Sequence, residues 1–285
     1  MNQVYWGILS ATSLGTADFF AGLTGRAIGY ATALLWVYVV SCIGLTTYMF
    51  VAGHPMIFAL SEQWSIVLFG VMNTVAMLML YRALARGPLS VAAPIVAAHP
   101  VLVVIYAFAL GSRLGTVQWL GIAFATLGAI MVARAATNDS PSVPSAKNGP
   151  TIVLAAGAGV AYAVVIVAAQ HAVPVHGEIQ TMWLGRIIAL VTLVPFLLIT
   201  KTSPGAPIRW WPLLCLQGSL DFGGVLFLLF GSSGDFAEIT AVVASLFGAV
   251  TVLLARIFFK EHMSLFQWSG VILVFVGVAC LSGAT

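Results

Sequence analysis

Charged residues are scarce in this sequence. Only 7% of its 285 residues are Asp, Glu, Lys or Arg, while 61% are hydrophobic. A soluble domain carries about 25% charged residues, so the composition excludes an ordinary soluble fold. Apolar runs of about 20 residues, enough for a helix to cross a hydrocarbon core of about 30 Å, recur along the chain. The sequence therefore predicts a polytopic integral membrane protein.

Several functional signatures are also missing. The three cysteines, Cys42, Cys215 and Cys280, lie far apart within apolar runs, which argues against a disulfide framework and against a metal site. The sequence has neither the G-x-x-x-x-G-K-[ST] pattern of ATP-binding loops nor a nucleic-acid signature. We therefore expect no cofactor, metal or nucleic-acid partner.

The sequence consists largely of apolar segments separated by turn signals. Because the segments lack the alternation of barrel strands, each is expected to be a helix. Ten are predicted, at roughly 4–24, 31–52, 64–84, 88–110, 116–134, 151–172, 179–200, 211–231, 237–259 and 265–283. The polar stretch 136–150 falls between the fifth and the sixth. We expect a first five-helix repeat (1–135), a polar linker (136–150) and a second five-helix repeat (151–285).

The two halves share landmarks. A shift of 149 residues places QWLG (Gln118–Gly121) on QWSG (Gln267–Gly270), and Gly128 on Gly277. With five spans in each half, the halves cross the membrane in opposite senses, which makes the repeat inverted. Inverted repeats are typical of secondary transporters, whose substrate site lies near the midplane between the repeats.

A five-plus-five arrangement, with a Q-W-x-G helix after a short turn at the end of each half, resembles the EamA-type branch of the drug/metabolite transporter superfamily. The second half carries FKEHMSL at this turn, where the family has a Gly-Glu turn; the first half has Ser112-Arg113 and no acid. The resemblance implies a carrier of small metabolites: amino acids, other organic acids, amines, phosphorylated compounds or toxic cations. It leaves the cargo open.

The distribution of basic residues bears on orientation. Most of the 11 Lys and Arg residues lie in or beside the odd-numbered loops. The positive-inside rule then places both termini outside, whereas members of the family are usually drawn with both inside. We expect a multi-pass protein of the cytoplasmic (inner) membrane, with either orientation open.

Ionisable residues within spans are candidates for function, because each costs at least about 2.5–3.5 kcal/mol to insert. Asp221, near the middle of the eighth span, is the strongest candidate. Gln217 and Gly224 extend its polar or small face, which is expected to point into the bundle. A buried ion pair between Asp221 and Arg186, within the seventh span, is the structural alternative.

Asp18, in the stretch GTADFFAGLTGR, is expected to lie closer to the end of its span. Its carboxylate could line the site, reach the membrane interface or pair with Arg26. Asn73, in the third span, lies beside the position that the repeat matches to Asp221. We therefore expect Asn73 to approach the same site from the first half.

The fourth span combines a histidine with two prolines. Pro94 and Pro100 predict a bent helix around His99, which would be either a gating element or a fixed kink. Further candidates for the walls of the site are aromatic, although such residues in spans usually face lipid or the interface: Trp36, Trp183, Tyr81 and Tyr162.

Carboxylates, a guanidinium and aromatic rings together suit a zwitterion, since the acids would hold an ammonium group and Arg186 a carboxylate. The leading prediction is a secondary transporter of small zwitterionic or cationic metabolites, amino acids or related amines, that works by alternating access. The alternative is a proton-coupled exporter of lipophilic or quaternary ammonium cations, with Asp18 or Asp221 as the titrating acid. An enzyme is disfavoured because no catalytic constellation is visible, and the oligomeric state stays open.

Overall fold

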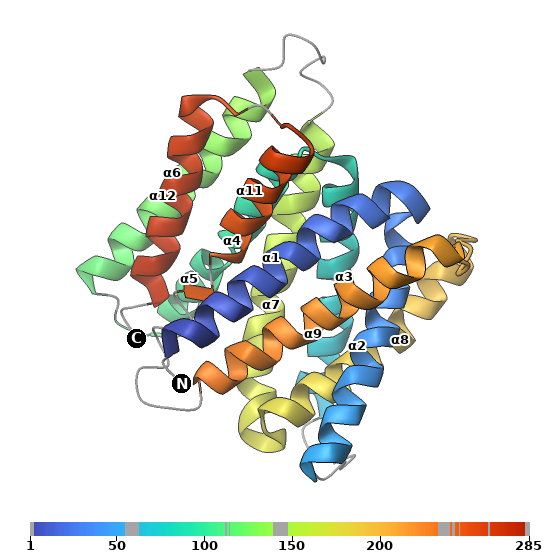
Figure 1. Ribbon diagram of the computed structural model, residues 1–285. Helices are drawn as coiled ribbons and strands as arrows, with labels where there is room; N and C mark the ends of the chain where they lie inside the picture. Colours follow the sequence, from blue (N-terminus) through green and yellow to red (C-terminus); the bar gives the residue numbers. More distant parts are fainter. Residues whose placement is uncertain are drawn as a thin grey trace.

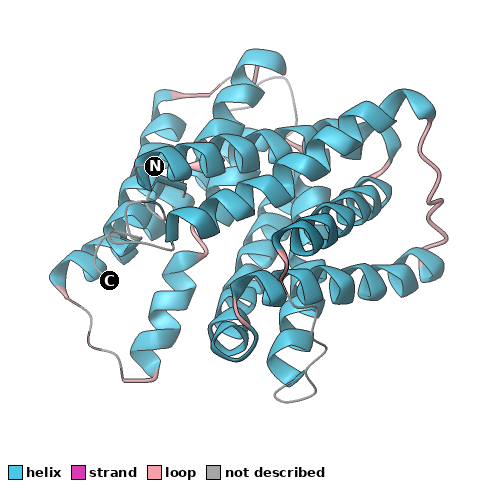
Figure 2. Cartoon of the chain, turned by 60° about the horizontal axis from the view of Figure 1, so that its bottom comes forward, coloured by secondary structure: helices cyan, strands magenta, loops and turns pink. Residues whose placement is uncertain are grey.

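The computed structural model describes residues 3–54, 63–111, 113, 115–138, 148–232, 240, 243–244, 246–261 and 263–282. Within these residues all regular secondary structure is helical, and Figure 2 shows helices joined by loops. The predicted all-α class is confirmed.

The helices follow the predicted apolar segments closely. In the first half they are α1 (Gln3–Ile28), α2 (Tyr30–Ala52), α3 (Gln63–Arg86), α4 (Leu89–Ala97), α5 (Pro100–Ala109) and α6 (Thr116–Asn138). In the second half they are α7 (Gly149–His176), α8 (Glu178–Ile199), the short 3-10 helix η2 (Ile208–Trp210), α9 (Trp211–Ser232), α11 (Phe247–Phe258) and α12 (Leu265–Ser282). Of the predicted span 237–259, most residues before 246 lie outside the described part of the chain, as does the middle of the linker.

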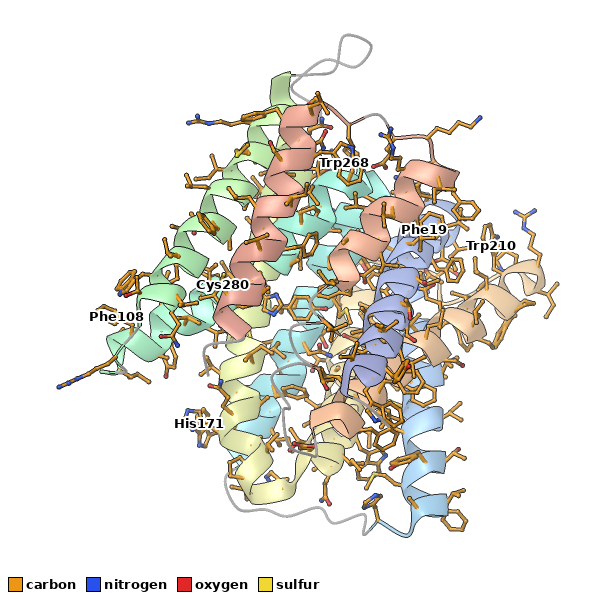
Figure 3. The ribbon with its side chains drawn as sticks, turned by 60° about the vertical axis from the view of Figure 1, so that its left-hand side comes forward. Phe19, Phe108, His171, Trp210, Trp268 and Cys280 are labelled. Atoms are coloured by element: carbon orange, nitrogen blue, oxygen red, sulfur yellow. The ribbon has the colours of Figure 1, made fainter. Side chains whose placement is uncertain are left out.

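Among the described residues, seven helical segments are long and apolar enough to cross a bilayer, and Phe247–Phe258 and Leu265–Leu281 are shorter apolar helices. Large apolar side chains also cover the outside of the protein. Phe108 and Trp119 are each 48% exposed, and Figure 3 shows Phe108 at the outer edge. Such a surface is stable against lipid tails and not against water. The chain is an integral multi-pass membrane protein.

The packing of the helices places residues from both halves of the chain side by side. Helix α1 packs along α9, and α3 packs along α7. In the same way α2 contacts α9 while α8 contacts α3, and α11 contacts α1 while α4 contacts α7. Figure 1 shows α1, α3, α7 and α9 in the middle of the bundle, with α6 and α12 together at one edge.

Helices α6 and α12 approach each other closely through glycine. A Cβ atom placed on Gly121 would lie 2.9 Å from the carbonyl oxygen of Gly277, and one on Gly128 would lie 2.5 Å from that of Gly270. Any side chain at these positions would therefore push the helices apart. Small residues that allow close backbone contact are a usual way to join helices in a membrane, where water does not drive association.

The fourth predicted span is broken into α4 and α5. Pro100 begins α5 and has no N–H to donate to the carbonyl of Val96. That carbonyl instead accepts from the backbone N–H of His99 at 3.0 Å, and His99 Nδ1 also lies 3.0 Å from it. Pro94, in contrast, is accommodated inside α4. The chain thus bends at His99, in the interior of the bundle.

Candidate functional site

A cavity of about 270 Å³ lies between helices of both halves. Its volume is close to the lower end of the range of about 300–1,000 Å³ typical of small-molecule pockets. Most of the lining is apolar, including the side chains of Leu14, Phe69, Val165 and Phe247. The polar side chains of the lining are Asp18, Asn73, Tyr81, His99, Tyr162, Arg186 and Asp221. All seven were candidates from the sequence, and the fold brings them to one cavity.

Arg186 and Asp221 form a buried ion pair across α8 and α9. Arg186 Nη2 donates to Asp221 Oδ2 at 2.6 Å, and each side chain is only 7% exposed. The Arg186 Cζ atom also lies 5.3 Å from the centre of the Tyr38 ring, over its face. The structure therefore contains the ion pair that the sequence left as the alternative. Both charges are compensated within the protein.

Asp18 lies on α1 and faces the cavity. Its side chain is partly accessible there, and it has no hydrogen bond or ion pair with any described residue. The predicted alternative of pairing with Arg26 is wrong, because Arg26 Nε donates to the carbonyl of Ala85 at 3.2 Å and its guanidinium lies 4.6 Å from the ring centre of Phe259. Asp18 is the carboxylate of the cavity that is free to meet a ligand.

His99 presents a hydrogen-bond acceptor to the cavity. Its Nδ1 faces the carbonyl oxygen of Val96, which can only accept, so Nδ1 carries the proton in the neutral ring. The other ring nitrogen, Nε2, is then an acceptor. It has no hydrogen-bond partner among the described residues, and the ring lies 5.7 Å from that of Tyr162. The break at Pro100 thus fixes the tautomer of a residue of the cavity.

Gln217 lies behind the cavity and orients Tyr81. The fully buried Gln217 donates from Nε2 to the Tyr81 hydroxyl at 3.0 Å, and its Oε1 lies 3.0 Å from the Thr24 hydroxyl. Because Tyr81 accepts from Gln217, its own O–H is left to donate. Asn73 is held similarly, with Nδ2 3.4 Å from the hydroxyl of Tyr38.

Two predicted wall residues, Trp36 and Trp183, lie away from this cavity. The Trp36 indole N–H donates to the carbonyl of Pro204 at 2.9 Å, and that of Trp183 donates to the Thr46 hydroxyl at 2.9 Å. Phe69 and Phe247 form part of the wall instead. Phenylalanines in apolar helices carry no signal that distinguishes a cavity from lipid, so these two could not be predicted from the sequence.

One turn next to the bundle is held by contacts that the sequence did not reveal. The carboxylate of Glu261, in the KEH turn, accepts from the backbone N–H groups of Leu89 and Ser90 at 3.0 and 2.9 Å. It thereby caps the N-terminus of α4, where a negative charge is favourable. The Thr151 hydroxyl at the start of α7 donates to the carbonyl of Gly87 at 2.8 Å. The α3–α4 turn of the first half is thus held by two residues of the second half.

Comparison with known proteins identifies the family. The model of the EamA-like transporter family matches residues 1–134 and again residues 149–283. The chain belongs to the EamA-like transporter family. This confirms the resemblance that the sequence showed at the Q-W-x-G helices. Members of this family are transporters, so a small-molecule substrate and a lipid environment follow from membership.

Solved structures support the fold of this EamA-family chain. One, described only as "Crystal structure of protein", superposes with a TM-score of 0.65 at 17% sequence identity, over 98% of this chain and 94% of the other. At this identity the likeness extends to the fold alone. No curated protein matches the chain.

Proposed function

We propose that this EamA-family protein is a secondary active transporter of small zwitterionic or cationic metabolites, such as amino acids or related amines, in the cytoplasmic membrane. The observation that carries the proposal is the cavity between the two halves of the chain. Its polar groups come from both halves, with Asp18, Asn73 and His99 from the first and Arg186 and Asp221 from the second. Ionisable groups at such a depth in a membrane protein mark substrate or ion pathways.

The packing of the helices favours ten spans in two inverted repeats, residues 1–135 and 151–285. The most extensive contacts between halves have partners when the halves are exchanged: α1–α9 corresponds to α7–α3, α2–α9 to α8–α3, and α1–α11 to α7–α4. The contact of Gly121 with Gly277 likewise corresponds to that of Gly270 with Gly128. The family model also matches each half separately. This is the symmetry of transporters that work by alternating access.

Alternating access requires that contacts at one end of the bundle break while others form. The Glu261 cap and the Thr151 bond to Gly87 join the two halves on one side, so the opposite conformation requires their release. The break at Pro100 gives the fourth span a hinge beside the cavity. We infer that Pro100 allows α4 and α5 to move separately, whereas Pro94, the other predicted gating residue, lies inside α4.

A second candidate is a proton-coupled exporter of lipophilic or quaternary ammonium cations. It is favoured by one observation: Asp18 has no partner among the residues that the structure describes, while Arg186 is already bound to Asp221. A single carboxylate could hold either a proton or a cation but not both at once. This competition would couple the flux of protons to the flux of the cation.

Reconstitution into proteoliposomes tests the proposal. Uptake of labelled amino acids and amines, and of a cationic dye, is measured with and without an imposed pH gradient, against protein-free vesicles. Saturable flux of an amino acid or amine supports the leading function, and pH-driven dye flux alone supports the second. If a monodisperse, folded protein gave no flux above the protein-free vesicles for any of them, the transport proposal would fail.

A further inference from the structure

The charge balance of the cavity points to the kind of substrate it binds. Within the described part of the chain, its charged side chains are Asp18, Arg186 and Asp221. Arg186 and Asp221 neutralise each other at 2.6 Å. Asp18 has no counter-charge in contact among the described residues, so the cavity holds one carboxylate in excess. An unpaired charge away from water is costly, and the cavity gains free energy when a cation, or a proton, joins Asp18.

The guanidinium needed to bind a carboxylate is not available. Arg186 Nη2 is engaged by Asp221, and Nη1 is buried, with no hydrogen bond to a described residue. One face of the guanidinium lies over the Tyr38 ring. A substrate carboxylate would therefore have to displace Asp221, which would leave that acid buried and unpaired. The cost of leaving Asp221 buried without a partner is far larger than any gain for Arg186, which would only exchange one carboxylate for another.

Two of the remaining polar groups match the donors of an ammonium group. The Asp18 carboxylate accepts hydrogen bonds and supplies the opposite charge, and Nε2 of His99 is a second acceptor. The rings of Tyr81, Tyr162 and Phe69 also line the cavity, and aromatic faces attract cations. The rest of the wall is apolar and suits a hydrocarbon or aromatic body.

We propose that the cavity binds a small organic monocation, a primary or secondary amine with an apolar body and no carboxylate, with Asp18 as its ion-pair partner and His99 as a hydrogen-bond acceptor. The proposal rests on the transport function above and narrows its substrate class. The volume of about 270 Å³ is enough for a body of a single aromatic ring with a short chain.

Three ligands that share a phenyl ring test this proposal: phenethylamine carries an ammonium group, phenylalanine an ammonium group and a carboxylate, and 3-phenylpropionate a carboxylate. Thermal unfolding of the purified full-length protein in detergent micelles is followed at increasing concentrations of each, since a ligand of the folded state raises the Tm by mass action. We expect phenethylamine to raise the Tm in a saturable way, and phenylalanine and 3-phenylpropionate to leave it unchanged.

Two variants assign the effect to Asp18. Asp18→Asn removes the charge from the cavity and is expected to abolish the Tm shift caused by phenethylamine. Glu178→Gln removes an exposed acid of α8 that does not line the cavity, and is expected to keep the full shift. Elution as a monodisperse peak and an unchanged helical circular dichroism spectrum establish that Asp18→Asn is folded. If that variant does not fold, the selectivity of the unmodified protein among the three ligands still decides the proposal.

Each result supports or overturns the proposal. Stabilisation by phenylalanine equal to or greater than that by phenethylamine would overturn it, while transport of zwitterions would stand. A shift that persists in folded Asp18→Asn would also overturn it, as would the absence of a shift with any amine between ethylamine and phenethylamine in size. Binding of the amine without flux in proteoliposomes would instead sink the transport function and leave the cation site in place.

Discussion

Removal of one partner of the Arg186–Asp221 pair is expected to destabilise the protein severely. In Asp221→Asn, the Arg186 guanidinium keeps its charge in an environment where its side chain is 7% exposed. Breaking a buried pair in this way costs about 3–5 kcal/mol, because the surviving charge stays desolvated without compensation. Arg186→Met leaves the Asp221 carboxylate unpaired and is expected to lose a similar amount.

The double variant shows whether Arg186 and Asp221 stabilise the fold as a pair or act as two independent residues. With Arg186→Met and Asp221→Asn combined, no charge is left unpaired, and replacement of a whole buried pair is often neutral or even stabilising by about 1–4 kcal/mol. We therefore expect the double variant to recover most of the stability that either single variant loses. A sum of the two single losses would mean that the residues act separately.

Reversible unfolding in mixed micelles, with increasing sodium dodecyl sulfate and detection by tryptophan fluorescence, gives the free energies for this cycle. Glu178→Gln serves as the control for an acid-to-amide change at an exposed position, where a change within about 0.5 kcal/mol is expected. If the free energy of unfolding of Asp221→Asn lay within about 1 kcal/mol of that of the unmodified protein, the ion pair would not stabilise the fold. Asp221 would then be available to a substrate, and the case for Asp18 as the free acid would weaken.

Three further changes have defined outcomes in the same unfolding assay or in ligand titrations. Glu261→Gln removes the charge that caps α4, and we expect a loss of about 1–2 kcal/mol; an unchanged free energy of unfolding would contradict this role. Gly277→Ala should cost about 1–3 kcal/mol because its methyl group meets the backbone of α6, whereas Gly223→Ala, whose methyl group meets no described atom within 4 Å, should not destabilise. Acidification should weaken amine binding, since protons on Asp18 and on Nε2 of His99 each make the cavity more positive; affinity that rises towards low pH would refute the assignment.

The sequence predicted the helices well because each apolar run has the length of a span and ends at a polar or glycine-containing turn. The predicted segment 179–200, for example, corresponds to α8 at Glu178–Ile199. The bend near His99 was also visible, because Pro100 removes one specific hydrogen bond. These features depend on local chemistry, which a single sequence contains.

The contents of the site depended on tertiary contacts and were predicted less well. Asp18 was expected close to the end of its span, yet α1 continues to Ile28, one turn beyond the predicted end, and Asp18 faces the cavity. The positions of Trp36 and Trp183 were inferred from the repeat, which fixes depth but not the side of the helix. The partners of Glu261 are about 170 residues away in the chain, so its role as a cap had no local signal.

The charges of the cavity are not repeated between the halves, even though the helix packing is. At the offset of 149 residues Asp18 corresponds to Val167, Arg186 to Val37 and Asp221 to Met72. The apolar counterparts cost nothing to insert, whereas each charged residue is expensive in a membrane. Arg186 and Asp221 offset their cost by pairing with each other, but Asp18 has no such compensation from a described residue. A carboxylate that does not stabilise the fold is best explained by what it binds. The shared architecture of the family thus identifies a transporter, and in our proposal Asp18 selects its cargo.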